Sequence, residues 1–416
     1  GDLVAVNPII NDTEVGEMID RSFAAYQSLR ATPLAERTEV LRRVAELHRE
    51  RREELAQLLT LEVGKPITQA RGEVDLVTSI YEYYADKAAS FLADESLEIA
   101  GGGEAIVRTE PIGPLLGIMP WNYPYYQVAR FAAPNLALGN TIILKHARNC
   151  PQSALAIEQV LRDAGLPQDA YINAFVDSRQ VPSIIADPRV QGVSLTGSET
   201  AGSAVGEVAG RHMKRVVLEL GGSDPFIVLE DADIDAAVEA GVRGRVGNGG
   251  QACTASKRFI VVDSVYNEFA EKFIAAMTRI SPSDPTDPDT FLGPLSSAAA
   301  AEELDELVAD AVAKGATLHT SDSSTRDGAF YAPNVLTGVT PDMRAYDEEL
   351  FGPTAVVYRV PSPQQAISLA NASPFGLSSS IFTQNIAQAQ EIARALEVGM
   401  VWINSTSRSA PDLPFG

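Results

Sequence analysis

The spacing of apolar residues predicts long helices at the start of this chain. Residues 14–62 repeat apolar positions at helical intervals, and they predict two amphipathic helices with Pro33 between them. Residues 67–95 continue with another long helical pattern. After a run of glycines at 101–103, residues 104–109 alternate apolar and polar positions, which predicts a strand.

From residue 115 onwards, short apolar runs alternate with helical segments. In the first series the predicted strands are 115–119, 141–144, 190–195 and 216–218, and the predicted helices are 152–164 and 200–209. The second series has predicted strands at 226–229, 258–262, 354–358, around Ile381 and at 400–404, with helices at 233–245, 266–279, 300–314, 363–371 and 386–395. This alternation is typical of parallel sheets covered by helices, so the expected fold class is α/β. The first series has the architecture of a dinucleotide-binding domain.

Composition and charge narrow the classes of protein without indicating a reaction. Of the 416 residues, 45% are hydrophobic and 21% are charged, which is ordinary for a globular chain of two or three domains. The 33 basic and 55 acidic residues give a net charge of −22, so we expect neither nucleic acid nor an anionic membrane as a partner. No stretch approaches the roughly 18 apolar residues of a membrane span.

The cysteines are few, and one of them lies in chemically suggestive surroundings. Two cysteines in so long a chain argue against a disulfide framework and fit a reducing cytoplasm. The four histidines are scattered, so no metal site is expected. Cys253 lies in the glycine-rich run 247–254, GNGGQACT. The glycines leave the sulfur open to a substrate, and a thiolate there can attack a carbonyl and form a covalent intermediate.

Two further segments carry groups that such thiol chemistry needs. Glu219 lies between an apolar run and two glycines, where partial desolvation raises the pKa of a carboxyl and suits it to general base work. Asn122 lies in the turn 120–124, PWNYP, and can donate its side-chain amide to an oxyanion, a contact typically worth about 3–4 kcal/mol. Taken alone, Glu219 is better explained as a surface or capping acid, and the turn as a proline-fixed turn with a packed Trp121.

Two features of the first series fit a bound dinucleotide. Residues 196–202, TGSETAG, place Gly197 and Ser198 at a strand-to-helix junction, where the amides of a helix N-terminus can bind a pyrophosphate. Lys145 follows the strand predicted at 141–144, at the edge where cofactors sit in open α/β sheets. The GxGxxG fingerprint is absent, and a plain glycine turn and a solvated lysine explain these features as well.

A third feature lies far along the chain, in residues 348–353, EELFGP. There Glu349 can hold ribose hydroxyls, and the ring of Phe351 can support a nicotinamide. An acidic turn is the ordinary explanation of the same segment.

In combination, and in this order, four motifs resemble those of the aldehyde dehydrogenase superfamily from end to end of the chain. They are PWNYP at 120–124, ELGG at 219–222, GQAC at 250–253 and ELFGP at 349–353. The resemblance implies a Rossmann-like cofactor domain, an α/β catalytic domain and a small β segment for oligomerisation. It also implies that the cofactor is NAD or NADP and that the partner is a small aldehyde substrate.

The resemblance implies a division of the chain into domains. Residues 1–98 and 113–219 form the NAD(P)-binding domain, residues 99–112 the oligomerisation segment, and residues 220–416 the catalytic domain. Residues 1–3 resemble the end of a first strand's turn. The family normally continues past the last residue with a strand that helps to join subunits, so the C-terminal end is expected to be missing. With that strand present, a homodimer or homotetramer is expected.

The same resemblance implies a role for each candidate residue. Cys253 is the nucleophile, Glu219 activates the deacylating water, and Asn122 forms the oxyanion hole with the N–H of Cys253. The implied cycle has four steps: thiolate adds to the aldehyde, hydride passes to the nicotinamide, water attacks the thioester, and the carboxylic acid leaves. The implied cofactor contacts are Trp121, Lys145, Gly197, Ser198, Glu349 and Phe351.

Finer motifs are similar to those of bacterial succinic semialdehyde dehydrogenases. They are LEVGKPI at 61–67, KHARN at 145–149 and ELGGSDPF at 219–226. Arg130 falls where some members of that group place an arginine, whose guanidinium can clamp a substrate carboxylate. An ordinary helix arginine in a salt bridge explains Arg130 equally well. A second arginine that some relatives carry ahead of the nucleophile is absent, since residues 246–247 read VG, and this weakens the assignment.

One position bears on the choice of cofactor. Many NAD-specific relatives have a glutamate three positions after the lysine that corresponds to Lys145, and here that position is Arg148. Without the acid, a 2′-phosphate is not repelled, and the cation can attract one. We therefore expect NADP to be accepted, and a preference for NADP over NAD is our hypothesis.

Three alternatives stay open. The first is the same chemistry on another aldehyde. The second is a CoA-acylating relative, which Glu219 argues against because such relatives typically lack that base. The third is a catalytically silent structural relative, which the joint presence of Cys253, Glu219 and Asn122 argues against.

Overall fold

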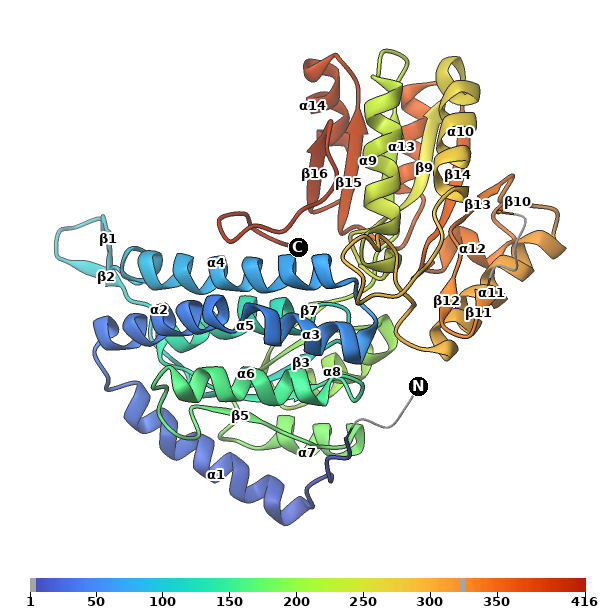
Figure 1. The fold of residues 1–416 in the computed structure, drawn as a ribbon. Coiled ribbons are helices and arrows are strands. Elements are labelled where there is room, and N and C mark those ends of the chain that lie inside the picture. Colours follow the sequence, from blue (N-terminus) through green and yellow to red (C-terminus); the bar gives the residue numbers. More distant parts are fainter. Residues whose placement is uncertain (1–4, 322–325) are drawn as a thin grey trace. The chain divides into compact units, whose positions relative to one another are not determined.

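The computed structural model describes residues 5–321 and 326–416, which divide into two compact units (Figure 1). Unit 1 comprises Gly1–Glu62, Ala70–Leu220 and Ala410–Leu413. Unit 2 comprises Val63–Gln69, Gly221–Ser409 and Pro414–Gly416. The strand end expected at residues 1–3 lies outside the described residues. Each unit has a parallel sheet with helices on both faces, so the predicted α/β class is confirmed.

Unit 1 is built on a five-stranded parallel sheet with the strand order β5-β4-β3-β6-β7. The strands are β3 (Pro114–Met119), β4 (Thr141–His146), β5 (Tyr171–Asn173), β6 (Gly192–Thr196) and β7 (Arg215–Glu219). Strands buried on both faces read as continuous apolar runs, which is why β3, β4 and β6 could be predicted. The sequence analysis did not predict β5, which has only three residues.

Helices cover both faces of this sheet (Figure 1). On one face, α1 (Asp12–Leu29), α7 (Val181–Ala186) and α8 (Glu199–Arg211) share one apolar core with the strands. The other face is covered by α5 (Pro124–Leu138) and α6 (Pro151–Asp163), and α2 (Leu34–Glu50) packs on those two helices.

Residues 14–62 form three helices, so the prediction of two was wrong. The helices are α1, α2 (Leu34–Glu50) and α3 (Arg52–Val63), and α4 (Ile67–Phe91) follows them. The extra break lies at Arg51, whose backbone leaves the helical region with φ −102° and ψ 19°. The apolar spacing runs on through this position, so the pattern alone carries no sign of the break.

The buried start of α5 is capped by a carboxylate from α4. Pro124 begins the helix and has no N–H to satisfy, which suits it to that position. The next two amides, of Tyr125 and Tyr126, donate to Oε1 of Glu73 at 2.9 and 3.1 Å. Glu73 is itself only 3% exposed. This contact fixes the helix that follows the PWNYP turn.

A second carboxylate caps α6 in the same way. Glu62 accepts the backbone N–H groups of Gln152 at 2.6 Å and Ser153 at 2.8 Å, and the Ser153 hydroxyl at 2.6 Å. Burial raises the pKa of Glu62, and these three bonds oppose the rise. Glu62 belongs to the LEVGKPI segment, so one residue of that motif has a structural explanation.

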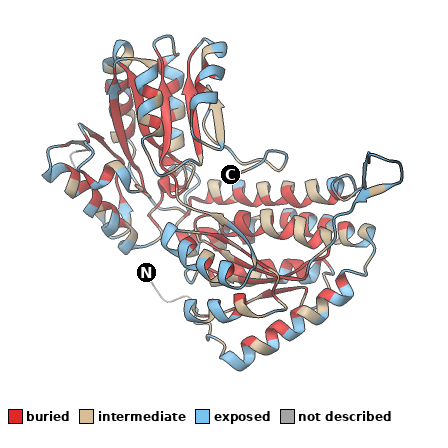
Figure 2. Ribbon diagram, turned by 180° about the vertical axis from the view of Figure 1, so that it is seen from behind, coloured by how far each residue is buried: buried red, intermediate tan, exposed pale blue. Residues whose placement is uncertain are grey.

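Unit 2 is built on a seven-stranded sheet with the order β10-β13-β14-β9-β8-β15-β16, parallel except for β10. Its strands are β8 (Asp224–Val228), β9 (Ser256–Val262), β10 (Thr317–His319), β13 (Asn334–Thr337), β14 (Thr354–Val360), β15 (Ser378–Phe382) and β16 (Met400–Ile403). The central strands are fully buried, as Figure 2 shows.

Two apolar cores hold the helices of unit 2 to its sheet. On one face, α9 (Ile234–Val246) and α10 (Asp263–Thr278) pack on the rings of Phe226 and Phe259. On the other face lie α11 (Ala298–Ala313), α13 (Pro363–Asn371) and α14 (Ile386–Ala395). Short elements that the sequence analysis did not predict are β10, β13, α12 (Arg344–Asp347) and the hairpin of β11 (Arg326–Asp327) and β12 (Phe330–Tyr331).

An exposed antiparallel hairpin follows α4. It consists of β1 (Glu95–Leu97) and β2 (Ala105–Val107), so it begins before the segment 99–112 that we expected to join subunits. The strand predicted at 104–109 is present as β2. Several apolar side chains of the hairpin are exposed: Leu97, Ile99, Ile106 and Val107.

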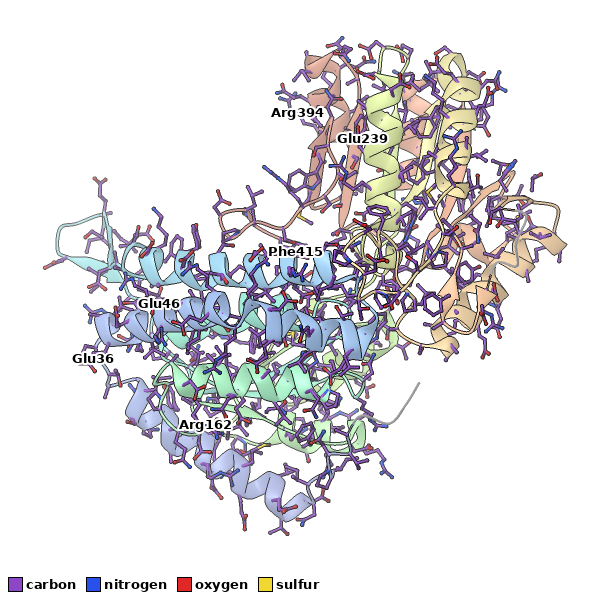
Figure 3. The ribbon with its side chains drawn as sticks, in the orientation of Figure 1. Glu36, Glu46, Arg162, Glu239, Arg394 and Phe415 are labelled. Atoms are coloured by element: carbon purple, nitrogen blue, oxygen red, sulfur yellow. The ribbon has the colours of Figure 1, made fainter. Side chains whose placement is uncertain are left out.

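Charged side chains of both signs lie on the outer faces of the helices. Glu36, Glu46 and Glu239 point outwards from their helices, as do the basic Arg162 and Arg394 (Figure 3). Among the described residues, no helix combines the length and the apolar character needed to cross a membrane.

We expect the substitution Glu73→Ala to lower the free energy of unfolding by about 2 kcal/mol, because it leaves two buried amides of α5 without an acceptor. Denaturant titration measures this change. The matched control is Glu82→Ala, on the same helix, whose carboxylate is half exposed and pairs with Arg49. That change should cost less than about 1 kcal/mol. Equal effects of the two substitutions would contradict the capping role.

Candidate active site

Cys253 follows a tight turn between α9 and β9 in unit 2. The turn η2 (Gly247–Gly250) has three consecutive residues in the left-handed region, Asn248, Gly249 and Gly250, with φ of 53°, 65° and 71°. This conformation costs most side chains about 1–2 kcal/mol per residue, whereas glycine adopts it freely and asparagine tolerates it. The glycines that drew attention to Cys253 in the sequence are therefore required by the turn itself.

Side-chain amides hold this turn in place. The N–H of Asn248 donates to Oε1 of Gln69 at 2.8 Å, and its Nδ2 donates to the carbonyl of Gln251 at 3.1 Å. In turn, Oε1 of Gln251 accepts the N–H of Ser296 at 2.9 Å. Cys253 lies at the end of this fixed turn and is partly exposed, whereas the other thiol, Cys150, is buried.

A buried lysine lies beneath the nucleophile turn, which we define as residues 247–255. Lys257 is 1% exposed, and its ammonium donates to the carbonyls of Ala252 at 2.9 Å and Cys253 at 3.2 Å. The same ammonium pairs with Oε1 of Glu349 at 3.2 Å. The N–H of Gly222 donates to that oxygen at 3.0 Å. The predicted ribose-binding acid is thus tied to the backbone of the predicted nucleophile.

A second buried cation, Arg245 on α9, contacts the same region. It is fully buried, and its guanidinium donates to the carbonyls of Gly250 at 2.7 Å, Ser256 at 3.2 Å and Leu350 at 3.4 Å. Burial lowers its pKa to about 9, opposed by Glu349 and by a buried aspartate of β8. Arg245 is engaged with backbone carbonyls, so it does not replace the arginine that some relatives carry ahead of the nucleophile.

The motif residues around these cations complete the site in unit 2. Burial raises the pKa of Asp224 to about 7, against the attraction of Lys257 and the hydrogen bonds from Ser378. Phe351 lies two residues after Glu349 and is partly buried.

In unit 1, Asn122 lies in the turn between β3 and α5. It is only 7% exposed, and its Oδ1 accepts the N–H of Tyr123 at 3.1 Å. That bond uses the acceptor end of the amide, and Nδ2 is the donor end that an oxyanion contact requires. Trp121 precedes it and is partly buried.

Glu219 ends β7 beside Arg130 of α5. The carboxylate lies 4.0 Å from the guanidinium, and the two side chains are 19% and 18% exposed. Arg130 also donates to the Thr196 hydroxyl at 3.4 Å and lies over the ring of Tyr126 at 5.6 Å. Burial raises the pKa of Glu219, and Arg130 opposes the rise. A raised pKa suits a general base that works near neutral pH.

The residues expected to bind a cofactor lie on β4 and at the start of α8. Lys145 is partly buried in β4, and burial lowers its pKa. Ser198 caps α8, accepting the N–H of Ala201 at 3.3 Å. A helix start leaves amides without intrahelical partners, and Gly197 has no neighbour closer than 3.6 Å to where a Cβ would lie. A cation and a helix N-terminus are groups that can bind the phosphates of a dinucleotide.

Arg148 lies three residues beyond Lys145 and is largely exposed. Its guanidinium donates to Oδ2 of Asp177 at 2.7 Å, while the other oxygen of Asp177 accepts from Arg179. The hydrogen bonds from the backbone N–H and the side chain of Arg179, with a smaller contribution from Arg148, lower the pKa of Asp177 to about 2. Arg148 and Arg179 share one aspartate, so this cluster after β4 keeps a net positive charge.

Within each unit, several predicted residues come together. Arg130 and Glu219 are neighbours in unit 1, and Cys253 and Glu349 share Lys257 in unit 2. Sequence reasoning did not single out Lys257 or Arg245. A signal for Lys257 was present, because a charged pair at 257–258 begins a strand that is otherwise apolar.

We expect Gly222→Ala to disturb the nucleophile turn, because the added Cβ would lie 2.1 Å from the carbonyl oxygen of Cys253. Backbone must move, at a cost of about 1–3 kcal/mol in unfolding free energy. The rate at which iodoacetamide alkylates Cys253 should change as well. The control is Gly210→Ala on α8, where a Cβ has no neighbour within 4 Å. Unchanged stability and alkylation in Gly222→Ala would contradict the close approach.

Comparison with known proteins shows which family the chain belongs to. Residues 1–416 match the model of the aldehyde dehydrogenase family. A succinate-semialdehyde dehydrogenase [NADP(+)] of Deinococcus radiodurans is 52% identical over all of this chain and 87% of its own length. One of Mycobacterium leprae is 42% identical over all of this chain and 93% of its length. A crystal structure of succinic semialdehyde dehydrogenase from Streptococcus pyogenes, in complex with NADP⁺, superposes with a TM-score of 0.97 at 40% identity, covering 99% of this chain and 91% of that one. The chain belongs to the aldehyde dehydrogenase family, as its motifs predicted.

Proposed function

We propose that this enzyme oxidises succinic semialdehyde to succinate with NADP as the hydride acceptor. NAD(P)-dependent aldehyde oxidation, which the motifs predicted, agrees with the family and with the names of its relatives. The observation that carries the substrate class is Arg130, a largely buried guanidinium beside Glu219. A guanidinium held there, with Glu219 as its acidic neighbour in unit 1, can bind the carboxylate of a short semialdehyde.

The proposed reaction begins at Cys253. Its thiolate adds to the aldehyde carbon, and the carbonyl oxygen becomes an oxyanion that accepts from Nδ2 of Asn122 and the N–H of Cys253. The bound cofactor supplies the nicotinamide that accepts hydride from the former aldehyde carbon. Glu219 then takes a proton from the water that attacks the thioester. The carbon–sulfur bond breaks, the carboxylic acid leaves, and the thiolate returns.

Seven residues are proposed to hold the cofactor. Lys145, Gly197 and Ser198 offer a cation and helix amides for its phosphates, and Arg148 a positive charge for a 2′-phosphate. Glu349 would accept from ribose hydroxyls. Its contacts with Lys257 and Gly222 both use Oε1, so neither uses Oε2. Trp121 and Phe351 are proposed to lie near the nicotinamide.

The domain roles follow the same proposal. We assign cofactor binding to 1–98 and 113–219 and catalysis to 220–416, and we propose that the segment 99–112 joins subunits in a homo-oligomer. The exposed apolar side chains of the β1–β2 hairpin support the last point. A cytoplasmic location is proposed from the two reduced cysteines.

The substrate assignment predicts the behaviour of Arg130→Met. Loss of the guanidinium should lower kcat/KM for succinic semialdehyde by about 100-fold, because the substrate carboxylate loses its partner. Pentanal has no carboxylate and should be affected far less. The comparison is made at the alkaline plateau of each pH profile, because without Arg130 the pKa of Glu219 rises further and at lower pH both substrates would also lose ionised base. Equal losses for the two aldehydes would contradict the carboxylate contact and favour another aldehyde.

The cofactor assignment predicts the behaviour of Arg148→Glu. Reversing one exposed charge should lower kcat/KM for NADP by about tenfold and leave kcat/KM for NAD nearly unchanged. The estimate takes about 1 kcal/mol or less for each exposed charge that is lost or gained. Arg179→Glu is the matched control, because Arg179 contacts the same Asp177 and is still more exposed. The hypothesis is wrong if the wild-type enzyme has a kcat/KM for NADP far below that for NAD.

A further inference from the structure

Two buried cations bridge the same two segments of unit 2. One segment is the nucleophile turn (247–255), and the other is 349–350 within the ELFGP motif. Lys257 links Cys253 to Glu349, and Arg245 links Gly250 to Leu350. An ionised side chain is costly to bury unless it is paired and hydrogen-bonded. Lys257 and Arg245 are 1% exposed or less, so each depends on the partners that it contacts here.

The contacts of Lys257 are specific to an ammonium. Its three N–H groups face the carbonyls of Ala252, Cys253 and Ala255 at 2.9, 3.2 and 3.4 Å, and the carboxylate of Glu349 lies at 3.2 Å. A neutral donor could also bond the carbonyls, but it would hold the carboxylate less strongly than an ammonium does. The pairing of Glu349 therefore depends on the charge more than the pairing of the turn does.

The charges around Lys257 come from four elements. Glu349 follows α12, Arg245 lies on α9, Asp224 on β8, and Cys253 precedes β9. Burial lowers the pKa of Lys257, Glu349 opposes this most strongly, and Arg245 adds to the lowering. Asp224 and the Cys253 thiolate also favour the charged ammonium. The attraction is mutual, so the ammonium favours the thiolate over the thiol. The neighbouring Arg258 is bonded to the carbonyls of Ser223, Leu369 and Ala370 instead.

We propose that Lys257 is a positioning residue that fixes the nucleophile turn and Glu349 relative to each other, with Arg245 as a second bridge between the same segments. The proposal rests on the proposed function only in taking Cys253 as the nucleophile and Glu349 as a cofactor contact. One ammonium then holds two things at once: the backbone of Cys253 and the acid proposed to hold the ribose. Lys257 contacts neither substrate nor cofactor in this account.

The decisive variant is Lys257→Met, which keeps the length of the side chain and removes its charge. The pH midpoint for alkylation of Cys253 by iodoacetamide, followed without cofactor or substrate, should rise, because the thiolate loses a nearby cation. The KM for NADP should rise and kcat should fall, and a displacement of about 1 Å can cost about 100-fold. Lys272→Met is the control, since Lys272 is an exposed lysine of α10 paired with Asp235 and Glu268.

Lys257→Gln covers the case in which the methionine variant does not fold. Glutamine can still donate to the carbonyls of the turn but carries no charge, so we expect a folded protein with the same shift in alkylation and the same rise in KM. Wild-type values of both in a folded variant would overturn the proposal. Loss of folding in both variants would also overturn it, in favour of a lysine that only stabilises the fold.

The alkylation measurement separates this proposal from the proposed function. In the wild-type enzyme, Cys253 should be alkylated faster than the buried Cys150, and succinic semialdehyde should be oxidised. If either result fails, the proposed function is wrong. If both hold and the Lys257 variants match Lys272→Met, the function stands and the positioning role is wrong.

Discussion

The constraint on which the site depends is a left-handed turn over a buried cation. Three successive residues with positive φ bring the chain round to Cys253, and only glycines and an asparagine adopt them at small cost. Such a turn leaves its carbonyls pointing at the interior. Lys257 and Arg245 donate hydrogen bonds to these carbonyls. Their positive charge also holds Glu349 close to the same turn.

Unit 1 uses carboxylates to cap the starts of two helices. Its helices α5 and α6 begin with proline in buried surroundings, and Glu73 and Glu62 satisfy their first amides. The capped α5 then carries Arg130 to the end of β7, where it faces Glu219. In the proposed function, this arginine serves both a substrate carboxylate and the base. Substrate bound to Arg130 would weaken its effect on Glu219 and raise the pKa of that carboxyl, which makes it a stronger base.

Much of this could be predicted from the sequence, and the remainder shows why pattern alone is limited. Long apolar runs marked β3, β4, β9 and β14, because buried parallel strands have no polar face. The three-residue strands β5 and β10 are too short for any periodicity, and the break at Arg51 leaves the apolar spacing intact. In the site, the motifs located the chemistry, but they do not reveal that Lys257 turns inwards. That depends on the carbonyls of a turn whose conformation only the structure gives.

The central claim is that Cys253 carries the substrate as a thioester which Glu219 releases. The most direct test is mass spectrometry of the Glu219→Gln enzyme after it is mixed with succinic semialdehyde and NADP. The account predicts one turnover of reduced cofactor and a succinyl group on the peptide that contains Cys253, with Cys150 unmodified. Steady turnover without an acyl group on Cys253, or an acyl group on Cys150 instead, would contradict it.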